Sequence, residues 1–234
     1  TTSTFTYSLT GTAPCVNVSS VATVNINPQP IAGTDGFTTV CETSLATIDL
    51  YSLITGEQSG GTWTRTGTGG TFDALAGTFI PAVGATTSTF TYTLTGTAPC
   101  VNASSVATVN INAQPNAGIA GSVSVCDNSL TLINLANIIT GEQAGGVWTR
   151  PTGTGGTFNA AAGTYTPAVG ATTSTFLYSL TGVAPCTTDT SLATVTINPQ
   201  PNAGVDGGVT VCDNSVAVID LFSLITGEQV GGVW

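Results

Sequence analysis

Residues 86–112, TTSTFTYTLTGTAPCVNASSVATVNIN, decide the fold. In Thr89–Leu94 the large side chains at 90, 92 and 94 alternate with threonines, and in Ala107–Ile111 residues 107, 109 and 111 alternate with polar ones. Alternation with a period of two predicts β-strands with one face in a core. Gly, Pro and Asn between the two strands are typical of turns. This stretch therefore predicts two strands that share a buried face.

The same stretch occurs three times in the chain. Residues 1–27 differ from it at two of 27 positions, and residues 172–198 are a more diverged copy. The period is 85 from Cys15 to Cys100 and 86 from Cys100 to Cys186, the extra residue being Pro151. Each copy also holds LITGEQ or IITGEQ, which leads into Gly-Gly-x-Trp. The sequence is a tandem array, and we expect it to belong to a longer one.

Short Pro-containing segments mark the joints between domains. They are Asn27-Pro28-Gln29-Pro30, Asn112-Ala113-Gln114-Pro115 and Asn198-Pro199-Gln200-Pro201. Proline removes a ladder donor and fixes φ, so these segments suit a stiff linker better than a strand interior. Division at the joints predicts a C-terminal half-repeat (1–27), two complete repeats (30–113 and 116–198) and an N-terminal half-repeat (202–234).

Further strands are expected in the second complete repeat, together with one short helical turn at Asn137–Gln143. The expected strands are Ser122–Cys126, Leu130–Leu135, Val147–Arg150 and Gly163–Pro167. Six or seven short strands in about 85 residues are typical of a sandwich. A β-solenoid would show a period of about 20–30 residues. The predicted fold class is all-β, with tandem Ig-like β-sandwich domains arranged as an extended filament.

Charge and composition exclude several classes of partner. The chain has no His and no Met, and its two cationic residues are Arg65 and Arg150, which leaves a net charge of −10. Nucleic acids and anionic membrane surfaces need Lys and Arg to neutralise their phosphates, so neither is an expected partner. The chain shows no apolar run near the roughly 20 residues of a membrane span, and we expect it not to be membrane-embedded.

Six cysteines fall two per repeat, and their pairing is open from the sequence. Cys100 has two candidate partners, Cys41 within one domain and Cys126 across a joint. We favour the pairs within a domain, Cys41–Cys100 and Cys126–Cys186, which leave Cys15 and Cys212 unpaired in this chain. Structural disulfides indicate an oxidising, extracellular setting. Two thiols per repeat without His fall short of a zinc site.

No enzyme activity, cofactor or metal is expected. The chain lacks His and Lys, the commonest general bases and nucleophile activators. Acidic residues also change between copies: Asp35 becomes Ala120, and Asp73 becomes Asn159. Calcium needs six to eight oxygen ligands, and no D-x-D run supplies them, so at most an incidental ion is expected at Asp189 or Asp206.

Aromatic and charged residues at fixed repeat phase are interpreted as structural. Trp63, Trp148 and Trp234 begin a strand after Gly-Gly, where a core position is more common than a sugar-stacking platform. Tyr7, Tyr92 and Tyr178 are predicted to occupy the corresponding core position of the alternating strand. The pairs Glu57 with Arg65 and Glu142 with Arg150 are predicted to form cross-strand ion pairs.

The repeat resembles those of giant cell-surface proteins of Bacteroidota. The resemblance rests on CDNSLTLINLANIITGEQAGGVWTR (126–150), GTFNAAAGTYTPAVGATTSTFLYSLTGVAPC (156–186) and ATVTINPQPNAG (193–204), and it covers the whole chain. It is closest to the gliding-motility adhesins of flavobacteria, which are exported through the type IX secretion system. It implies a cell-surface filament with an Ig-like stalk, used in attachment and gliding.

The expected partners are neighbouring repeats of the same long chain, with other fibres or surface glycans as further candidates. Two alternatives stay open at this point. In one, the chain is a subunit of a polymerised, pilus-like extracellular fibre. In the other, it is a carbohydrate-binding module that uses Trp148. Joining 202–234 of one chain to 1–27 of another leaves out about 22 residues, those matching 64–85, which disfavours strand exchange between subunits.

Overall fold

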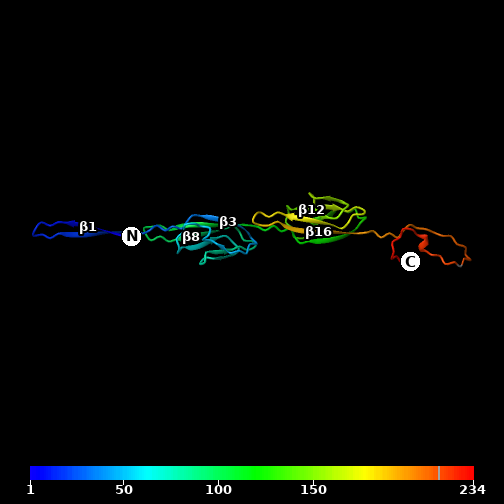
Figure 1. Ribbon diagram of the computed structural model, residues 1–234, viewed down its shortest axis with the longest axis horizontal. Coiled ribbons are helices and arrows are strands. Elements are labelled where there is room, and N and C mark those ends of the chain that lie inside the picture. The colour runs from blue at the N-terminus through cyan, green and yellow to red at the C-terminus, as the bar shows by residue number, and fades with distance from the viewer. Residues whose placement is uncertain (216) are drawn as a thin grey trace. The chain divides into compact units, whose positions relative to one another are not determined.

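The computed structural model describes residues 1–215 and 217–234. The chain divides into two compact units (Figure 1). The first comprises Thr1–Pro115 and Gly182–Thr187, and the second comprises Asn116–Thr181 and Thr188–Trp234. The division after Pro115 falls at the end of a predicted joint. The loop 182–187 was expected with the rest of 116–198 but belongs to the first unit.

Residues 36–112 form a sandwich of two sheets. The four-stranded sheet has the order β3-β9-β8-β5, and the three-stranded sheet has the order β4-β7-β6. β3 runs parallel to β9, and every other neighbouring pair is antiparallel. The strands are β3 (Gly36–Cys41), β4 (Ile48–Asp49), β5 (Thr62–Thr66), β6 (Thr71–Asp73), β7 (Thr78–Ile80), β8 (Ser88–Leu94) and β9 (Ala103–Asn112).

This strand order is that of an Ig-like sandwich. The second, fourth and fifth strands form one sheet, and the third, sixth and seventh form the other, as in immunoglobulin domains. The first strand joins the edge of the larger sheet by pairing with the last. The all-β, Ig-like part of the predicted fold class is confirmed by this topology.

Residues 121–198 repeat the same topology, with sheets β10-β16-β15-β12 and β11-β14-β13. Their elements are β10 (Gly121–Cys126), β11 (Ile133–Asn134), a 3-10 turn η1 (Leu135–Asn137), β12 (Val147–Thr152), β13 (Thr157–Asn159), β14 (Thr164–Thr166), β15 (Ser174–Leu180) and β16 (Asp189–Asn198).

Two local predictions for this second sandwich were wrong. The strand expected at Leu130–Leu135 is only Ile133–Asn134, and the helical turn expected at Asn137–Gln143 ends at Asn137. The turn starts early because the Asn134 side chain caps it, with Oδ1 accepting from Ala136 N at 3.1 Å. Strand β13 was missed because three residues are too few to show alternation.

Each sandwich has its own aromatic core. In the first, Trp63, Phe79, Phe90 and Tyr92 are at most 4% exposed. The Trp63 and Tyr92 rings lie 5.1 Å apart, and the Phe79 and Phe90 rings lie 5.0 Å apart. The second sandwich repeats both pairs with Trp148 and Tyr178 (4.9 Å) and with Tyr165 and Phe176 (4.9 Å). Four of the predicted core aromatics, Trp63, Trp148, Tyr92 and Tyr178, are therefore buried.

The two partial repeats lack such a core. Strands β1 (Thr2–Leu9) and β2 (Val18–Asn25) form a hairpin in which every strand residue is exposed. Tyr7 is 65% exposed, whereas its counterpart Tyr92 is 0% exposed. Trp234 is 69% exposed, although it keeps an edge contact with Phe222 of the 3-10 turn η2 (Phe222–Leu224) at 5.4 Å. The prediction of core positions is wrong for Tyr7 and Trp234. In the partial repeats, too few aromatic rings surround these two side chains to cover them as Tyr92 and Trp63 are covered.

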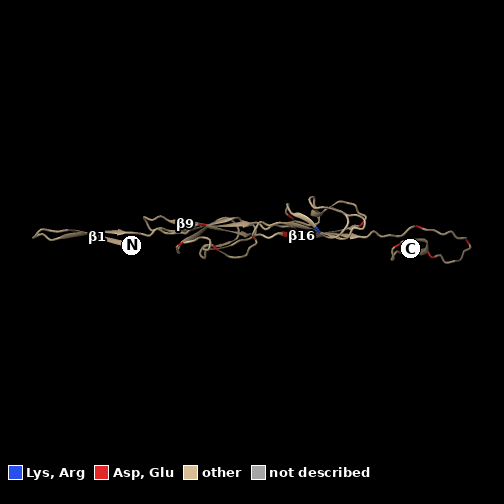
Figure 2. Cartoon of the chain, turned by 45° about the horizontal axis from the view of Figure 1, so that its top comes forward, with Lys and Arg blue, Asp and Glu red and all other residues tan. Residues whose placement is uncertain are grey.

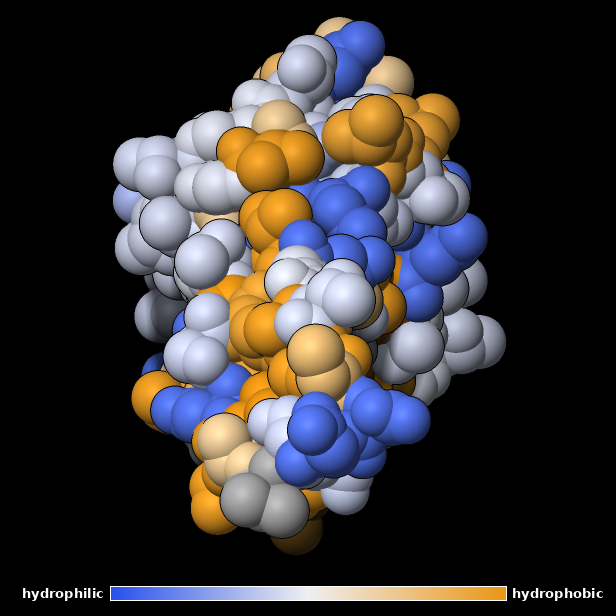
Figure 3. Space-filling model, turned by 90° about the vertical axis from the view of Figure 1, so that its right-hand side faces the viewer, coloured by the Kyte–Doolittle hydropathy of each residue, from blue (hydrophilic) through white to orange (hydrophobic). Residues whose placement is uncertain are grey.

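Apolar side chains consequently reach the surface, as the orange atoms of the space-filling view show (Figure 3). Acidic residues are sparse and scattered along the chain rather than gathered at one place (Figure 2). Among the described residues, no helix has both the length and the apolar composition needed to cross a membrane.

Candidate functional site

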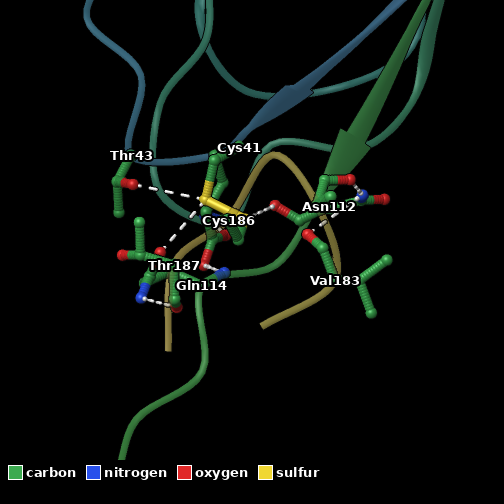
Figure 4. The surroundings of a disulfide bond; sticks show 10 residues. Cys41, Thr43, Asn112, Gln114, Val183, Cys186 and Thr187 are labelled. Carbon is green, nitrogen blue, oxygen red and sulfur yellow. Dashed lines mark hydrogen bonds between the residues drawn. A yellow bond between two sulfur atoms is a disulfide. The ribbon is translucent and has the colours of Figure 1, made fainter. Parts of the chain in front are cut away.

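The candidate site is a disulfide between two copies of the repeat. Cys41, the last residue of β3, bonds to Cys186, which lies in the loop between β15 and β16 (Figure 4). The two residues are 145 positions apart in sequence, with Cα atoms 4.9 Å apart, and each is 7% exposed. The predicted pairs Cys41–Cys100 and Cys126–Cys186 are therefore wrong.

The parallel pairing of the first and last strands explains the correction. Cys41 is in register with Asn112, at the end of β9, whereas Cys100 precedes Ala103, at the start of the same strand. Ten strand residues at about 3.3 Å each place the two cysteines about 30 Å apart. A disulfide needs Cα atoms within about 7 Å. Cys126, in register with Asn198, and Cys186, just before Asp189, are separated in the same way by β16.

Two side chains of the joint Asn112–Pro115 hold the loop that carries Cys186. Asn112 Nδ2 donates to Ala184 O at 2.8 Å and to Val183 O at 3.4 Å. Gln114 Nε2 donates to Thr187 O at 3.0 Å. Figure 4 shows Asn112 beside Val183 and Gln114 beside Thr187. The joint is thus a receptor for backbone carbonyls, and not merely a stiff spacer.

The acidic residue after the first cysteine fixes this receptor in place. The Glu42 carboxylate accepts from Gln114 N at 3.0 Å and from Gly84 N at 2.8 Å. Glu42 N donates to Asn112 O at 2.9 Å, which continues the β3–β9 ladder past Cys41. Thr43 Oγ1 donates to Cys41 Sγ at 3.3 Å. These bonds attach the backbone of Asn112 and Gln114 to the segment that follows Cys41.

The loop has a fixed local structure of its own. Cys186 N donates to Val183 O at 2.9 Å. A Cβ added to Gly182 would lie 2.6 Å from the carbonyl oxygens of Cys186 and Thr187, so only glycine fits there. The loop therefore presents its carbonyls and its cysteine in one arrangement.

The same joint recurs between Asn27–Pro30 and the loop 96–101. Asn27 Nδ2 donates to Ala98 O at 2.8 Å, and Gln29 Nε2 donates to Val101 O at 2.9 Å. Cys100 Sγ lies 3.3 Å from Asn27 O, the distance that separates Cys186 Sγ from Asn112 O. The role of the Asn and Gln side chains was not predicted from the sequence. Their strict recurrence at Asn-x-Gln-Pro, where a spacer needs no particular side chain, is the signal that would have found it.

The buried tryptophans do not form a sugar platform. Trp63 and Trp148 are 4% and 7% exposed, with one ring edge against Tyr51 in the first repeat. Stacking on a sugar needs an open ring face, so a carbohydrate site that uses Trp148 would have to disrupt the core.

The predicted ion pairs are also wrong. Within the described residues, Arg65 donates to Ser88 Oγ at 2.9 Å and to Gly69 O, and its guanidinium lies 4.5 Å from the centre of the Phe79 ring. Arg150 repeats this arrangement with Ser174 Oγ at 2.7 Å and with the Tyr165 ring at 5.0 Å. Each arginine lies two residues after a tryptophan and therefore on the same face of its strand. There its guanidinium binds a serine instead of Glu57 or Glu142. Burial lowers the pKa of Arg65.

The glutamine of the GEQ motif ties the start of each repeat. Gln58 Oε1 accepts from Ile31 N at 3.0 Å, and Gln143 Oε1 accepts from Asn116 N at 2.9 Å. The backbone of the same segment binds the core tyrosine: Tyr92 Oη donates to Gln58 O at 2.7 Å and accepts from Gly61 N at 2.8 Å. The motif is thus explained by local packing.

Replacing Tyr92 by Phe is expected to lower the free energy of unfolding by about 1–3 kcal/mol, because it leaves the Gln58 carbonyl and the Gly61 amide without their partner. Chemical denaturation followed by fluorescence measures the change. Tyr7→Phe is the matched control, since Tyr7 is exposed, and it should leave stability unaltered. Equal losses for both variants would contradict the assignment.

Tyr92 should also make stability depend on alkaline pH. Burial, with a smaller contribution from Tyr51, raises the pKa of the Tyr92 phenol above its ordinary value of 10.0. The folded state therefore favours the neutral phenol, and its stabilising contribution is complete below pH 10 and is lost as pH rises through the folded-state pKa. The Tyr92→Phe variant should lack this part of the decline. Parallel pH curves above 10 for wild type and variant would contradict it.

Asp189 and Asp206, considered as incidental calcium ligands, are not brought together. Asp189 Oδ2 accepts from Ala117 N at 2.8 Å, so it ties the start of the second sandwich to β16. In the part of the chain that the structure describes, no three acidic, Cys or His side chains gather as a metal site.

Comparisons with known proteins give structural neighbours only. No protein-family model and no curated protein matches the chain. A three-Ig fragment of titin carrying an E-to-A mutation is 9% identical with a TM-score of 0.45, covering 78% of this chain and 70% of the fragment. The EC1-2 fragment of human protocadherin-24 is 12% identical with a TM-score of 0.41, covering 76% of this chain and all of that one. The fold assignment rests on the strand order described above.

Proposed function

We propose that this chain is part of the stalk of a large secreted cell-surface adhesin filament, which acts in surface attachment and gliding motility. The observation that carries the proposal is the Cys41–Cys186 bond, which joins two successive copies of the repeat covalently. Such a bond keeps successive domains connected under tension, which a stalk requires and a domain that functions alone does not.

The joint supports a mechanical role in a second way. Asn112 and Gln114 bind backbone carbonyls of the next copy's loop, so the linker is held by hydrogen bonds in addition to proline. The disulfide is consistent with an extracellular setting. The role we propose is structural and not enzymatic, in keeping with acids that change between copies while the core and the joint recur.

The resemblance to flavobacterial gliding adhesins supplies the finer part of the proposal. It implies export through the type IX system, a cell-surface location and movement along the cell. Neighbouring repeats of one long chain are the proposed partners. A polymer of separate subunits would need the same joint, and a gel of native fibres separates the two: uniform small subunits released by reduction would indicate polymerisation.

Labelling of intact source cells tests the proposal. Antibodies raised against this chain are expected to bind without permeabilisation, and deletion of the repeat region should reduce attachment and gliding speed. Labelling only after permeabilisation would overturn the surface location. Attachment lost with normal gliding would retain the adhesin and remove the motility role.

A further inference from the structure

A receptor like that of Cys41 is built around Cys126, and no loop of the described residues is bonded to it. Asp127 N donates to Asn198 O at 2.9 Å, as Glu42 N does to Asn112 O at 2.9 Å. Gln200 N donates to Asp127 Oδ1 at 3.0 Å, as Gln114 N does to Glu42 Oε1 at 3.0 Å. Cys126 is nevertheless exposed and forms no disulfide within the described residues. The amide side chains of Asn198 and Gln200 correspond to those that bind the loop of Cys186.

The matching loop is present at the other end of the chain. Cys15 N donates to Thr12 O at 2.9 Å, as Cys186 N does to Val183 O at 2.9 Å. Gly11 N donates to Asn17 Oδ1 at 2.9 Å, the bond that Gly96 N makes to Asn102 Oδ1 at 3.0 Å in the next copy. Cys15 is exposed and unpaired among the described residues. The loop therefore keeps its local hydrogen bonds without a disulfide partner in the described residues.

Recognition does not depend on the disulfide. The loop 96–101 lies on Asn27 and Gln29 with the same hydrogen bonds as the bonded case, although Cys100 has no sulfur partner in the described chain. The amides thus position the loop, and the two sulfur atoms are brought together as a consequence.

We propose that Cys126 receives the loop of a further copy of this repeat and forms with it the bond that Cys41 forms with Cys186. The rule is directional: the cysteine at the end of the first strand pairs with the loop cysteine of the following copy. Each joint of the array is then linked by a disulfide. Cys212 follows the same rule and pairs with the loop cysteine of the copy after its own. This inference rests on the proposed stalk function and deepens it by naming what links the copies.

The chemistry balances with a disulfide oxidant of the glutathione class. The thiolate of Cys126 attacks the loop cysteine sulfur in its mixed disulfide with glutathione, and glutathione leaves as a thiolate. Overall, two cysteine thiols lose two electrons and two protons, and one oxidised glutathione becomes two reduced ones.

Two variants of the chain test the proposal, with Cys41 and Cys186 kept in both. The receptor variant carries Cys15→Ser, Cys100→Ser and Cys212→Ser, so that it retains Cys126. The loop variant carries Cys100→Ser, Cys126→Ser and Cys212→Ser, so that it retains Cys15. The two are mixed in a glutathione redox buffer, and disulfide dimers are counted by intact mass.

Heterodimers are expected to exceed the random ratio to homodimers by about ten-fold, because the docked loop raises the local thiol concentration. Adding Asn198→Ala and Gln200→Ala to the receptor variant should return the ratio to random, with near-UV circular dichroism showing that the fold is kept. A random ratio for the unaltered receptor, or an absence of heterodimers, would overturn the proposal. Neither result bears on cell-surface labelling, so failure here is distinguishable from failure of the stalk function.

Discussion

Pulling the chain from its two ends under oxidising conditions is expected to release about 500 Å less length than pulling it after reduction. The Cys41–Cys186 bond carries the force past 145 positions of sequence, and each residue contributes about 3.4 Å when extended. Every strand from β4 to β15 lies between the two cysteines and is therefore shielded from the force. Single-molecule extension with and without reductant measures the difference.

The double variant Cys41→Ser, Cys186→Ser gives this experiment its matched comparison. It should release the full length without reductant, and reductant should then have no further effect. The variant should also be less stable, by up to about 5 kcal/mol in the chain-entropy model for a loop of this size. Cys126→Ser, a substitution at an exposed cysteine, should change neither quantity in monomeric protein. Equal extension of the oxidised and reduced chains would show that Cys41 and Cys186 are not bonded.

The alternation of residues 90, 92 and 94 was enough to predict the buried face of β8, because a strand with one face in the core has a period of two. Short strands escaped the same reasoning. Thr157–Asn159 pairs with β14 through only three residues. A sequence of three residues is too short to distinguish a strand from a turn. Tertiary pairing alone makes it a strand.

The disulfide could not be predicted from spacing within a repeat. Cys41 and Cys100 belong to one sandwich, and the choice between partners depends on which end of β9 each one occupies. That is decided by the parallel pairing of β3 with β9, a contact between strands more than 60 positions apart in sequence. A single sequence with alternating strands does not distinguish a parallel edge from an antiparallel one.

The ion pairs failed for a related reason. Arg65 follows Trp63 by two residues, so the period of β5 places both on the inner face. Opposite charge was the reason to predict Glu57 as the partner of Arg65. The inner face of β5 instead places the guanidinium against Ser88 and the Phe79 ring. For the few charges of this chain, backbone geometry outweighs electrostatic pairing.

Replacing Trp63 by Ala is expected to lower the free energy of unfolding by about 3–5 kcal/mol, the cost of removing a large ring from a packed core. Trp63 is 4% exposed and contacts the rings of Tyr51 and Tyr92 at 5.4 Å and 5.1 Å. With Trp63 absent, both tyrosines border a cavity. Denaturant unfolding followed by circular dichroism measures the loss.

Trp234→Ala is the control that the repeat itself supplies. It removes the same side chain at the same repeat phase, but from a position that is 69% exposed with one ring contact to Phe222. Its cost should stay within about 0.5 kcal/mol, as for most surface substitutions. A large loss at Trp234, or a small one at Trp63, would contradict the burial that distinguishes them. Because the sequence before the two residues is nearly the same, GEQSGGT and GEQVGGV, the difference between the variants measures what a complete sandwich adds to a tryptophan that this preceding sequence alone does not bury.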